Sequence, residues 1–435
     1  AASDVYKRQG FPKSHCYLET GHEKGDAIMD NLKDIWSALF QSLSAFGYEE
    51  GQGTTRLSWS NPFLEAQKYL HSYAEAAGLQ CQRDGWGNLL MTVPGETGLP
   101  PVYTGSHLDT VPHGGKYDGA LGITVPLAIA AAWHQAGFRP RRPLTIIAFA
   151  EEEGTRFGPP CMGSQAMAGK LQGKDPGSFI TAEGQPLPQL LQEAGLEGDP
   201  FAPHLLPGKC FVEMHIEQGR ALEDAKLPLG IVSAIVGIRH FIIRVQGQAN
   251  HAGTTAMKDR HDALAAAAAE ISEIHQCALT SNNQYVATVG HIRVSPDAGN
   301  VIPGEAEFSL EIRAEEDSTM DCVVSAYKDF SRNLEKQYGV RFLWNQLDQI
   351  PPLPMDRKIM ELFQSYAQKE SVRFQIQPSW AGHDAMILGH ELPTAMLFVP
   401  SKNGISHSPE EFTSAEDIGQ AASVLEKVLT HLTRE

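Results

Sequence analysis

The chain contains 435 residues, of which 42% are hydrophobic and 20% are charged. A chain of this length usually needs more than one hydrophobic core, so we expect two domains. Its 52 acidic and 35 basic residues give a formal net charge of −17. Such a surface repels phosphate backbones and anionic lipids, which argues against nucleic acid or a membrane surface as a partner.

No membrane-spanning or exported segment is predicted. The longest apolar stretch, Ile123–Trp133, falls short of the roughly 20 residues that a membrane-spanning helix needs. Residues 1–26 lack the apolar core of a signal peptide, and we expect them to be a disordered or non-native terminus. The six cysteines are widely spaced without a C-x-x-C pair, which is typical of reduced thiols in a cytoplasmic protein.

Helices and strands alternate through most of the chain. Apolar residues at helical spacing predict helices at Ile28–Phe46, Pro62–Ala77 and Ala120–Gln135. Short apolar runs predict strands at Asn88–Val93, Pro101–Thr104, Leu144–Ala150, Cys210–Ile216 and Met396–Val399. This alternation predicts an α/β fold with a mostly parallel sheet.

The middle of the chain has a different rhythm. We predict strands and helices, in chain order, at Ile238–Val245, Asp259–Leu279, Tyr285–Val294, Ala306–Ile312, Asp321–Tyr338 and Val340–Trp344. The order β-α-β-β-α-β is that of a ferredoxin-like α+β unit. One continuous domain is the simpler alternative. The change of rhythm favours an α/β domain built from residues 27–236 and 351–435, with residues 237–350 inserted as a smaller domain.

Four segments rich in His, Asp and Glu follow predicted strands or lie at their ends. They are GSHLDTVPHGGKYDGALG (105–122), AEEEGTRF (150–157), EMHIEQG (213–219) and GISHSPEEF (404–412). Ligands of open α/β sheets bind outside the carboxyl ends of the strands. The pattern therefore predicts one polar site at that edge of the sheet.

In the first segment, His107 and Asp109 lie two residues apart, so both side chains point the same way in an extended chain. The Asp109 carboxylate is then expected to accept the second ring N–H of a metal-bound His107. Asp118 lies at a predicted helix start, where the helix dipole favours a carboxylate, and its two oxygens suit a bridge between two ions. An H-x-D pair alone is weak, because such pairs are common on surfaces.

The second segment places Glu151, Glu152 and Glu153 directly after a wholly apolar strand. A solvated loop is the usual explanation of such a charge run. At a sheet end, one carboxylate suits a metal ligand and its neighbour a general base. With His215 and His407, the segments supply N and O donors for two zinc-like ions, and the absence of thiolate ligands leaves Mn²⁺, Co²⁺ or Ni²⁺ open as well as Zn²⁺.

The motifs GSHLDTVP, KYDGALG, EEEG, HIEQG and GISHSPEEF occur in this order and resemble those of the M20 dinuclear-metal amidohydrolases. Within that superfamily they are similar to the branch of N-carbamoyl-L-amino-acid hydrolases, allantoate amidohydrolases and yeast-type β-ureidopropionases. The resemblance runs from about residue 31 to the end of the chain. It implies that residues 27–236 and 351–435 form a dinuclear-metal catalytic domain, and that residues 237–350 form a dimerisation and lid domain of a homodimer.

The resemblance also implies a ligand set. Asp118 would bridge two ions, with His107 and His215 on one and with Glu153 and His407 on the other.

Among the catalytic residues, Glu152 would be the general base and Asp109 would support His107. The histidine of HIEQG stands where peptidases of the superfamily usually carry an acid, which favours the ureido-cleaving branch over an M20 metallopeptidase or an N-acyl-amino-acid deacylase.

In the inserted domain, NHAGTTAM resembles the segment whose histidine, here His251, polarises the scissile carbonyl. Asn300 and Arg313 resemble residues that hold the substrate carboxylate, for which Arg offers a planar charged fork. By itself, Arg313 would be interpreted as a surface charge. The resemblance implies that closure of the two domains brings His251 and Arg313 to the metal centre.

Gln218, Gly382 and His383 resemble further substrate contacts. Trp380 departs from the family, whose members commonly carry a small residue there, so the side-chain preference of relatives does not transfer directly. The expected reaction is hydrolysis of the ureido C–N bond of a small carboxylate-bearing substrate, with release of ammonia and CO₂. The sequence leaves open whether that substrate is allantoate or an N-carbamoyl-L-amino acid.

Overall fold

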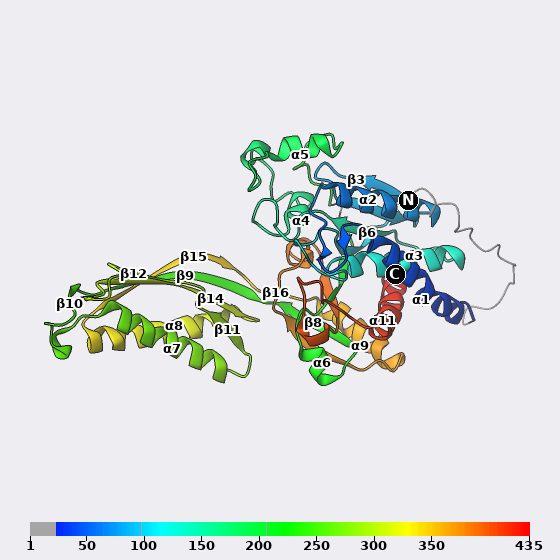
Figure 1. The fold of residues 1–435 in the computed structure, drawn as a ribbon. Coiled ribbons are helices and arrows are strands. Elements are labelled where there is room, and N and C mark those ends of the chain that lie inside the picture. Colours follow the sequence, from blue (N-terminus) through cyan, green and yellow to red (C-terminus); the bar gives the residue numbers. More distant parts are fainter. Residues whose placement is uncertain (1–22, 97, 206) are drawn as a thin grey trace.

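The computed structural model describes residues 23–96, 98–205 and 207–435, with side chains from residue 31 onward. Residues 1–22 of the expected disordered terminus lie outside the described residues, whereas residues 23–26 belong to helix α1 (Glu23–Leu43). A large α/β domain carries a smaller sheet-and-helix domain that projects to one side (Figure 1). This arrangement is the two-domain α/β fold that the sequence predicts.

The large domain is built on a nine-stranded sheet. Its central strands β18, β7, β5 and β6 run parallel, and antiparallel pairs occur toward both edges. The nine strands are β3 (Gln80–Arg83), β4 (Leu89–Val93), β5 (Val102–His107), β6 (Leu144–Phe149), β7 (Cys210–Ile216), β8 (Leu229–Ile235), β16 (Leu353–Pro354), β17 (Phe374–Ser379) and β18 (Thr394–Val399). The parallel centre confirms the predicted sheet type.

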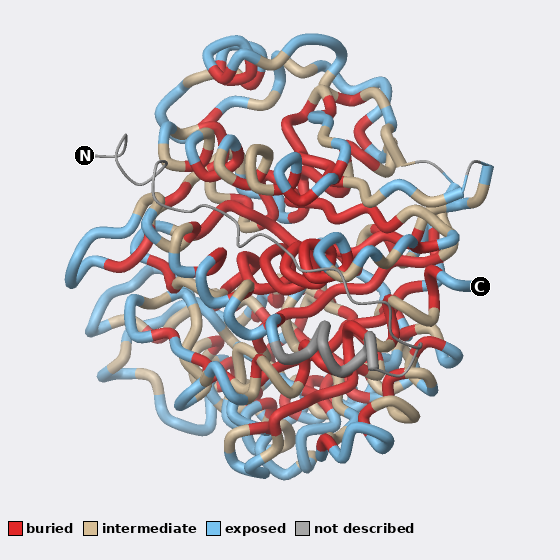
Figure 2. Tube along the Cα trace, turned by 90° about the vertical axis from the view of Figure 1, so that its right-hand side faces the viewer, coloured by how far each residue is buried: buried red, intermediate tan, exposed pale blue. Residues whose placement is uncertain are grey.

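Helix α3 (Ala120–Gln135) has the bounds that the sequence predicts and is buried almost throughout. It is apolar on every side because it lies between strand β5 and helix α1. The buried residues gather in the interior of the molecule (Figure 2), and α3 and the central strands supply many of them. The other helices of this domain are α2 (Asn61–Ala76), α4 (Met162–Met167), α5 (Leu187–Glu193), α6 (Ala221–Ala225), α9 (Arg357–Lys369), α10 (Asp384–Leu388) and α11 (Ala415–Arg434).

The small domain has an antiparallel sheet with the order β11-β14-β9-β15, and β12 also pairs with β14. Helices α7 (Ala263–Thr280) and α8 (Asp317–Tyr338) pack against one face (Figure 1). The strands are β9 (Gly237–Gln246), β11 (Tyr285–Thr288), β12 (Ile292–Ser295), β14 (Glu305–Ala314) and β15 (Arg341–Ile350). This sheet and its helices share a hydrophobic core separate from that of the large domain.

Two predicted strands of the small domain differ from the observed ones by more than two residues. The predicted strand Tyr285–Val294 is split into β11 and β12, because the backbone N–H groups of Gly290 and His291 donate to the side-chain hydroxyl of Ser309 on β14 instead of to backbone carbonyls of that strand. Strand β15 continues to Ile350 through a polar, mostly exposed stretch. Apolar periodicity cannot detect this extension, because the strand forms an edge of the sheet and few of its side chains are buried.

Short paired segments complete the fold. Strands β1 (Tyr48–Glu49) and β2 (Gly53–Thr54) form a small ribbon in the large domain. Strands β10 (Asn250–His251) and β13 (Val301–Ile302) pair at the end of the small domain that lies far from the large sheet (Figure 1). Within the described residues, no helix is both long enough and apolar enough to span a membrane.

The separate cores generate a stability prediction. Phe308 is fully buried in the small-domain core, and truncating such a side chain typically costs about 3–5 kcal/mol. We expect Phe308→Ala to increase hydrogen exchange throughout strands β9, β14 and β15 while protection of β5 and β6 stays unchanged. Mass spectrometry of peptide fragments measures both. An equal loss of protection in the two sheets would contradict independent cores.

Candidate metal centre

Four chain segments deliver polar side chains to the carboxyl ends of the central parallel strands. His107 is the last residue of β5, and it lies opposite Phe149, the last residue of the parallel strand β6. Glu151, Glu152 and Glu153 follow β6 after Ala150, so they lie at the same end of the sheet as His107. His215 lies near the end of the neighbouring strand β7. His407 comes from the loop that follows β18 and precedes α11.

Asp118 lies at the centre of this group. Its Oδ1 is 3.2 Å from His107 Nε2 and 3.1 Å from His215 Nε2. Its Oδ2 is 3.5 Å from His407 Nε2, and that nitrogen is 3.4 Å from Glu153 Oε2. One carboxylate oxygen thus faces the first histidine pair, and the other faces His407.

These residues form two groups whose potential ligand atoms all lie within 4.8 Å of one another: His107, Asp118 and His215, and Asp118, Glu153 and His407. Both groups contain Asp118. The structure therefore brings together all five residues that the sequence analysis proposes as metal ligands, in the division expected for a bridging aspartate.

Hydrogen bonds fix the tautomers of the two buried histidines. His107 Nδ1 lies 2.9 Å from the backbone carbonyl of Asp109, and His215 Nδ1 lies 2.9 Å from that of Ile216. A carbonyl only accepts, so Nδ1 carries the proton in both rings and the Nε2 lone pairs face Asp118. When the rings are neutral, the Nε2 atoms and the Asp118 carboxylate are all acceptors, so a cation, either a proton or a divalent metal ion, has to lie between them.

Asp109 contacts His107 as predicted, but through a different atom from the predicted carboxylate oxygen. The Asp109 backbone carbonyl, and not its carboxylate, accepts the His107 ring N–H. The carboxylate instead accepts the backbone N–H groups of Glu152 and Glu153, each at 3.2 Å. The chain turns after His107, so residues two apart are no longer on one side of an extended strand. Asp109 thereby fixes the loop that carries both glutamates.

Backbone strain accompanies the site. Glu151, Gln218 and His407 all adopt positive φ angles, of 66°, 58° and 54°. Non-glycine residues rarely occupy this region, and such strain is common at binding and catalytic sites. Glu151 stabilises its own turn, because its Oε1 accepts the backbone N–H groups of Arg156 and Phe157.

The carboxylates are crowded and buried. Burial and the nearby Asp118 charge raise the pKa of Glu153 to about 8. Burial likewise raises the pKa of Glu152 well above its ordinary value. Burial lowers the pKa of His107, but the charges of Glu152 and Asp118 outweigh it and raise that pKa. The centre therefore attracts positive charge, as a metal site does.

A third group, Glu213, His215 and His383, also places potential ligand atoms close together. The Nδ1 atom of His215 is bonded to the carbonyl of Ile216, however, so only its Nε2 atom, which faces Asp118, could bind an ion. Glu213 accepts from the Ser106 hydroxyl and from the Ala385 amide. This group is therefore less suited to hold an ion of its own than the two groups that contain Asp118.

Three of the five proposed substrate contacts belong to the large domain. Gln218 donates from Nε2 to Asp118 Oδ2 at 2.9 Å, and its Oε1 is buried without a partner. The ring of His383 packs edge-on against that of His215, with 4.6 Å between centroids. A Cβ at Gly382 would meet no atom within 4 Å, so open space adjoins this position.

The other two proposed substrate contacts, Arg313 and Asn300, lie in the small domain together with the proposed catalytic residue His251. Arg313 sits near the domain junction, where its Nη1 donates to the Trp380 carbonyl. His251 is in β10, and the Asn300 carbonyl accepts from Ala252 close by. Strand β10 lies at the far end of the small domain (Figure 1). One chain therefore does not bring His251 or Asn300 to the metal-ligand residues.

The sequence analysis missed two residues that hold Asp118. Ser406 donates to Asp118 Oδ2 at 2.6 Å, and Glu411 accepts from the backbone amides of Tyr117 and Asp118. Both belong to the segment GISHSPEEF that supplied His407. The position of Glu411 four residues after the predicted ligand His407 was the available signal, but nothing in the sequence shows which backbone amides Glu411 contacts.

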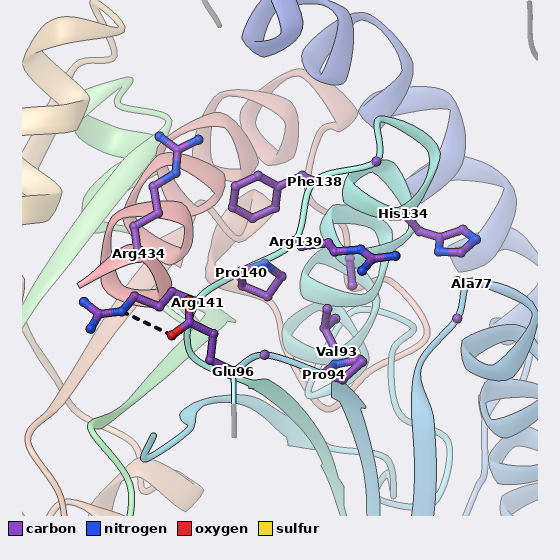
Figure 3. A pocket seen from close by; sticks show the side chains of 14 residues that line it. Ala77, Val93, Pro94, Glu96, His134, Phe138, Arg139, Pro140, Arg141 and Arg434 are labelled. Carbon is purple, nitrogen blue, oxygen red and sulfur yellow. Dashed lines mark ion pairs between the residues drawn. The ribbon is translucent and has the colours of Figure 1, made fainter. Parts of the chain in front are cut away.

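A separate hollow lies beyond the amino-terminal end of β6, away from the candidate metal centre. Its lining includes residues that follow β4 and residues that precede β6 (Figure 3). Arg139, Arg141 and Arg434 stand around it, but their guanidinium groups point in different directions. Arg141 is paired with Glu96 at 3.6 Å. Because no charged groups converge there, this hollow does not compete with the metal centre as a functional site.

Comparison with known proteins places this geometry in context. Residues 103–431 match peptidase family M20/M25/M40. The N-carbamoyl-L-amino acid amidohydrolase of Geobacillus stearothermophilus is 36% identical, over 90% of this chain and 96% of that protein. The allantoate amidohydrolase of Bacillus subtilis is 33% identical, over 92% of this chain and 98% of that protein. A crystal structure of an amidase of the hydantoinase/carbamoylase family from Burkholderia multivorans is 30% identical, with a TM-score of 0.84 over 93% of this chain and 98% of that one.

The crowded carboxylates generate a pH prediction for the metal-free protein. Burial raises the pKa of Glu151 and of Glu411 to about 7 and that of Glu153 to about 8, from 4.5. A raised carboxyl pKa stabilises the fold fully below pH 4.5, and that contribution is lost as the pH rises toward 8. We expect the Tm of the metal-free protein to fall from about pH 5 to about pH 8.

Scanning calorimetry measures this slope. Glu153→Gln should flatten it, whereas Glu410→Gln, a change at an exposed neighbour of Glu411, should leave it intact. Adding Zn²⁺ or Mn²⁺ should raise the Tm more at pH 8 than at pH 5, because the carboxylates are then ionised. A metal-free Tm that rises over this pH interval would contradict the electrostatic description.

Proposed function

The chain belongs to peptidase family M20/M25/M40, and from this membership we propose that it hydrolyses the carbamoyl (ureido) C–N bond of an N-carbamoyl-L-amino acid or of allantoate. The observation that carries the proposal is the pair of three-residue groups sharing Asp118. Relatives named as N-carbamoyl-L-amino acid amidohydrolase and allantoate amidohydrolase, aligned over nearly the whole chain, support the substrate class.

We further propose two divalent ions, Zn²⁺ or alternatively Mn²⁺, Co²⁺ or Ni²⁺, in the two groups. His107, Asp118 and His215 would hold one ion, and Asp118, Glu153 and His407 the other. When bound, such ions lower the pKa of a coordinated water and polarise a carbonyl oxygen. Nitrogen and carboxylate donors without thiolates suit all four metals.

Glu152 is placed to move the proton in this reaction. Its Oε2 lies 3.8 Å from His107 Nε2, and its carboxylate lies in one group with His107 and Glu153 but in neither of the two groups that contain Asp118. Glu152 takes a proton from the attacking water and returns it to the leaving nitrogen as the ureido C–N bond breaks. The released carbamic acid then decomposes to ammonia and CO₂.

The substrate carboxylate is assigned to Arg313. This side chain lies at the junction of the two domains and is the cation among the predicted contacts. A guanidinium recognises a carboxylate through two parallel hydrogen bonds. Gln218 and His383 lie beside Asp118 and His215, where they border the same site.

We also propose that a second copy of the chain completes the site. The resemblance gives His251 the role of polarising the scissile carbonyl and Asn300 a contact to the carboxylate, but both lie at the far end of the small domain (Figure 1). In a homodimer formed through the small domains, that end of one subunit reaches the metal centre of the other. Binding of substrate between them would then exclude water.

The proposed reaction is tested by ammonia release from the metal-reconstituted protein, with allantoate and a panel of N-carbamoyl-L-amino acids as substrates. Glu152→Gln should lower kcat by about 100-fold or more, because general acid–base catalysis contributes 10²–10⁴-fold. Metal content, measured by mass spectrometry, should stay unchanged in this variant. Release of amines from dipeptides or N-acyl amino acids, with none from ureido compounds, would favour a peptidase or deacylase instead.

The proposed dimer is tested by mixing two inactive variants, Glu152→Gln and His251→Ala. In a hybrid dimer, one site combines the intact Glu152 of one subunit with the intact His251 of the other, so activity should reappear after the variants are unfolded and refolded together. Each variant refolded alone is the control. Failure to recover activity, with hybrid dimers present in native mass spectra, would contradict the sharing of His251 between subunits.

A further inference from the structure

A row of charged side chains crosses the face of the small sheet opposite helices α7 and α8. Asp348 on β15, His240 on β9 and Glu311 on β14 lie side by side in the strand register. His240 Nδ1 is 2.6 Å from Asp348 Oδ1, and His240 Nε2 is 2.9 Å from Glu311 Oε2. The histidine thus joins two carboxylates on neighbouring strands.

The row continues to Arg313 and across the domain junction. Glu311 Oε1 accepts from Arg313 Nε at 2.7 Å. Arg313 Nη1 donates to the backbone carbonyl of Trp380 at 2.8 Å, and Trp380 follows β17 of the large domain. Asp348, His240, Glu311 and Arg313 therefore form a continuous line of hydrogen bonds that ends on the other domain.

The segment that Arg313 contacts leads directly to the metal centre. The hydroxyl oxygen of Ser379, the residue before Trp380, lies 2.8 Å from His383 Nε2. The His383 ring packs against the proposed ligand His215. Only two residues therefore separate Trp380, whose carbonyl Arg313 contacts, from His383, whose ring packs against His215.

Two of the three guanidinium nitrogens are fixed by these bonds. Nε is held by Glu311 and Nη1 by Trp380, whereas Nη2 has no hydrogen-bond partner among the residues that the structure describes. The Arg313 side chain keeps 28% of its surface exposed. A planar guanidinium that is fixed in this way loses little further freedom when it binds a ligand.

We propose that Glu311, held in place by His240, is a positioning residue that orients Arg313 for the carboxylate of the substrate. This inference rests on the proposed function and adds the residues that prepare its carboxylate contact. Without Glu311, the long arginine side chain would regain its rotamer freedom, and binding of the carboxylate would have to restore the order.

The same strand offers a matched control. Glu307 lies four residues before Glu311 on the same face of β14, and its Oε2 accepts from Arg244 Nη2 at 2.8 Å. This pair has the same chemistry as Glu311 and Arg313 but does not involve Arg313 or Trp380. Glu311→Ala and Glu307→Ala therefore remove equivalent carboxylates, and only the first should affect the substrate.

The test compares kcat and KM of metal-loaded variants with the best ureido acid. We expect Glu311→Ala to raise KM about tenfold with little change in kcat, because losing a charge-assisted hydrogen bond weakens the contact that Arg313 makes. Glu311→Gln, which keeps an acceptor oxygen, should recover part of the loss. Glu307→Ala should match the wild type. Glu311 is partly exposed, so these variants should fold.

A second measurement separates positioning from a general defect. Binding of the ureido acid and of its neutral amide is measured by calorimetry in a Glu152→Gln background, which needs no turnover. Glu311→Ala should weaken only the acid. Equal weakening of acid and amide, or a KM like that of Glu307→Ala, would overturn the inference. Absence of ammonia release from the wild type would instead reject the proposed function.

Discussion

The site depends on the burial of several carboxylates beside His107 and His215, whose Nε2 atoms face Asp118. Asp118 Oδ1 lies between His107 and His215, and both rings carry their protons on the opposite nitrogen. Buried charge without a partner is costly, so this arrangement requires cations. The surrounding contacts serve this constraint: Glu411 and Ser406 hold the Asp118 segment.

The parallel sheet explains why these residues meet although they are distant in sequence. Strands β5, β6 and β7 run in one direction, so the segments after them emerge at one edge. The small domain projects to one side of the large domain and carries β10 at its far end (Figure 1). The candidate metal ligands therefore lie in one domain, whereas His251 and Asn300 lie at the far end of the other, which is the reason for proposing a second subunit.

Much of the fold, and the grouping of the five candidate ligands, could be predicted from the sequence because the signals are local. Helix α3 matched its apolar run, and the acidic and histidine residues followed apolar strands. The contact of the Asp109 carboxylate could not be predicted, because it depends on a turn that sequence spacing does not reveal. Strand β17 was not predicted, since its polar residues Gln375 and Gln377 alternate with few apolar ones. The link from Arg313 to Trp380 joins residues distant in sequence, and no local pattern indicates it.

We propose that Asp118 would bridge two metal ions, and the other proposals depend on this arrangement. Crystals of the metal-loaded protein, with diffraction data collected on both sides of the absorption edge of the metal, test it most directly. We expect two anomalous peaks, one among His107, Asp118 and His215 and one among Asp118, Glu153 and His407. A single peak, or a peak between Glu213 and His383, from crystals grown in excess metal would contradict it.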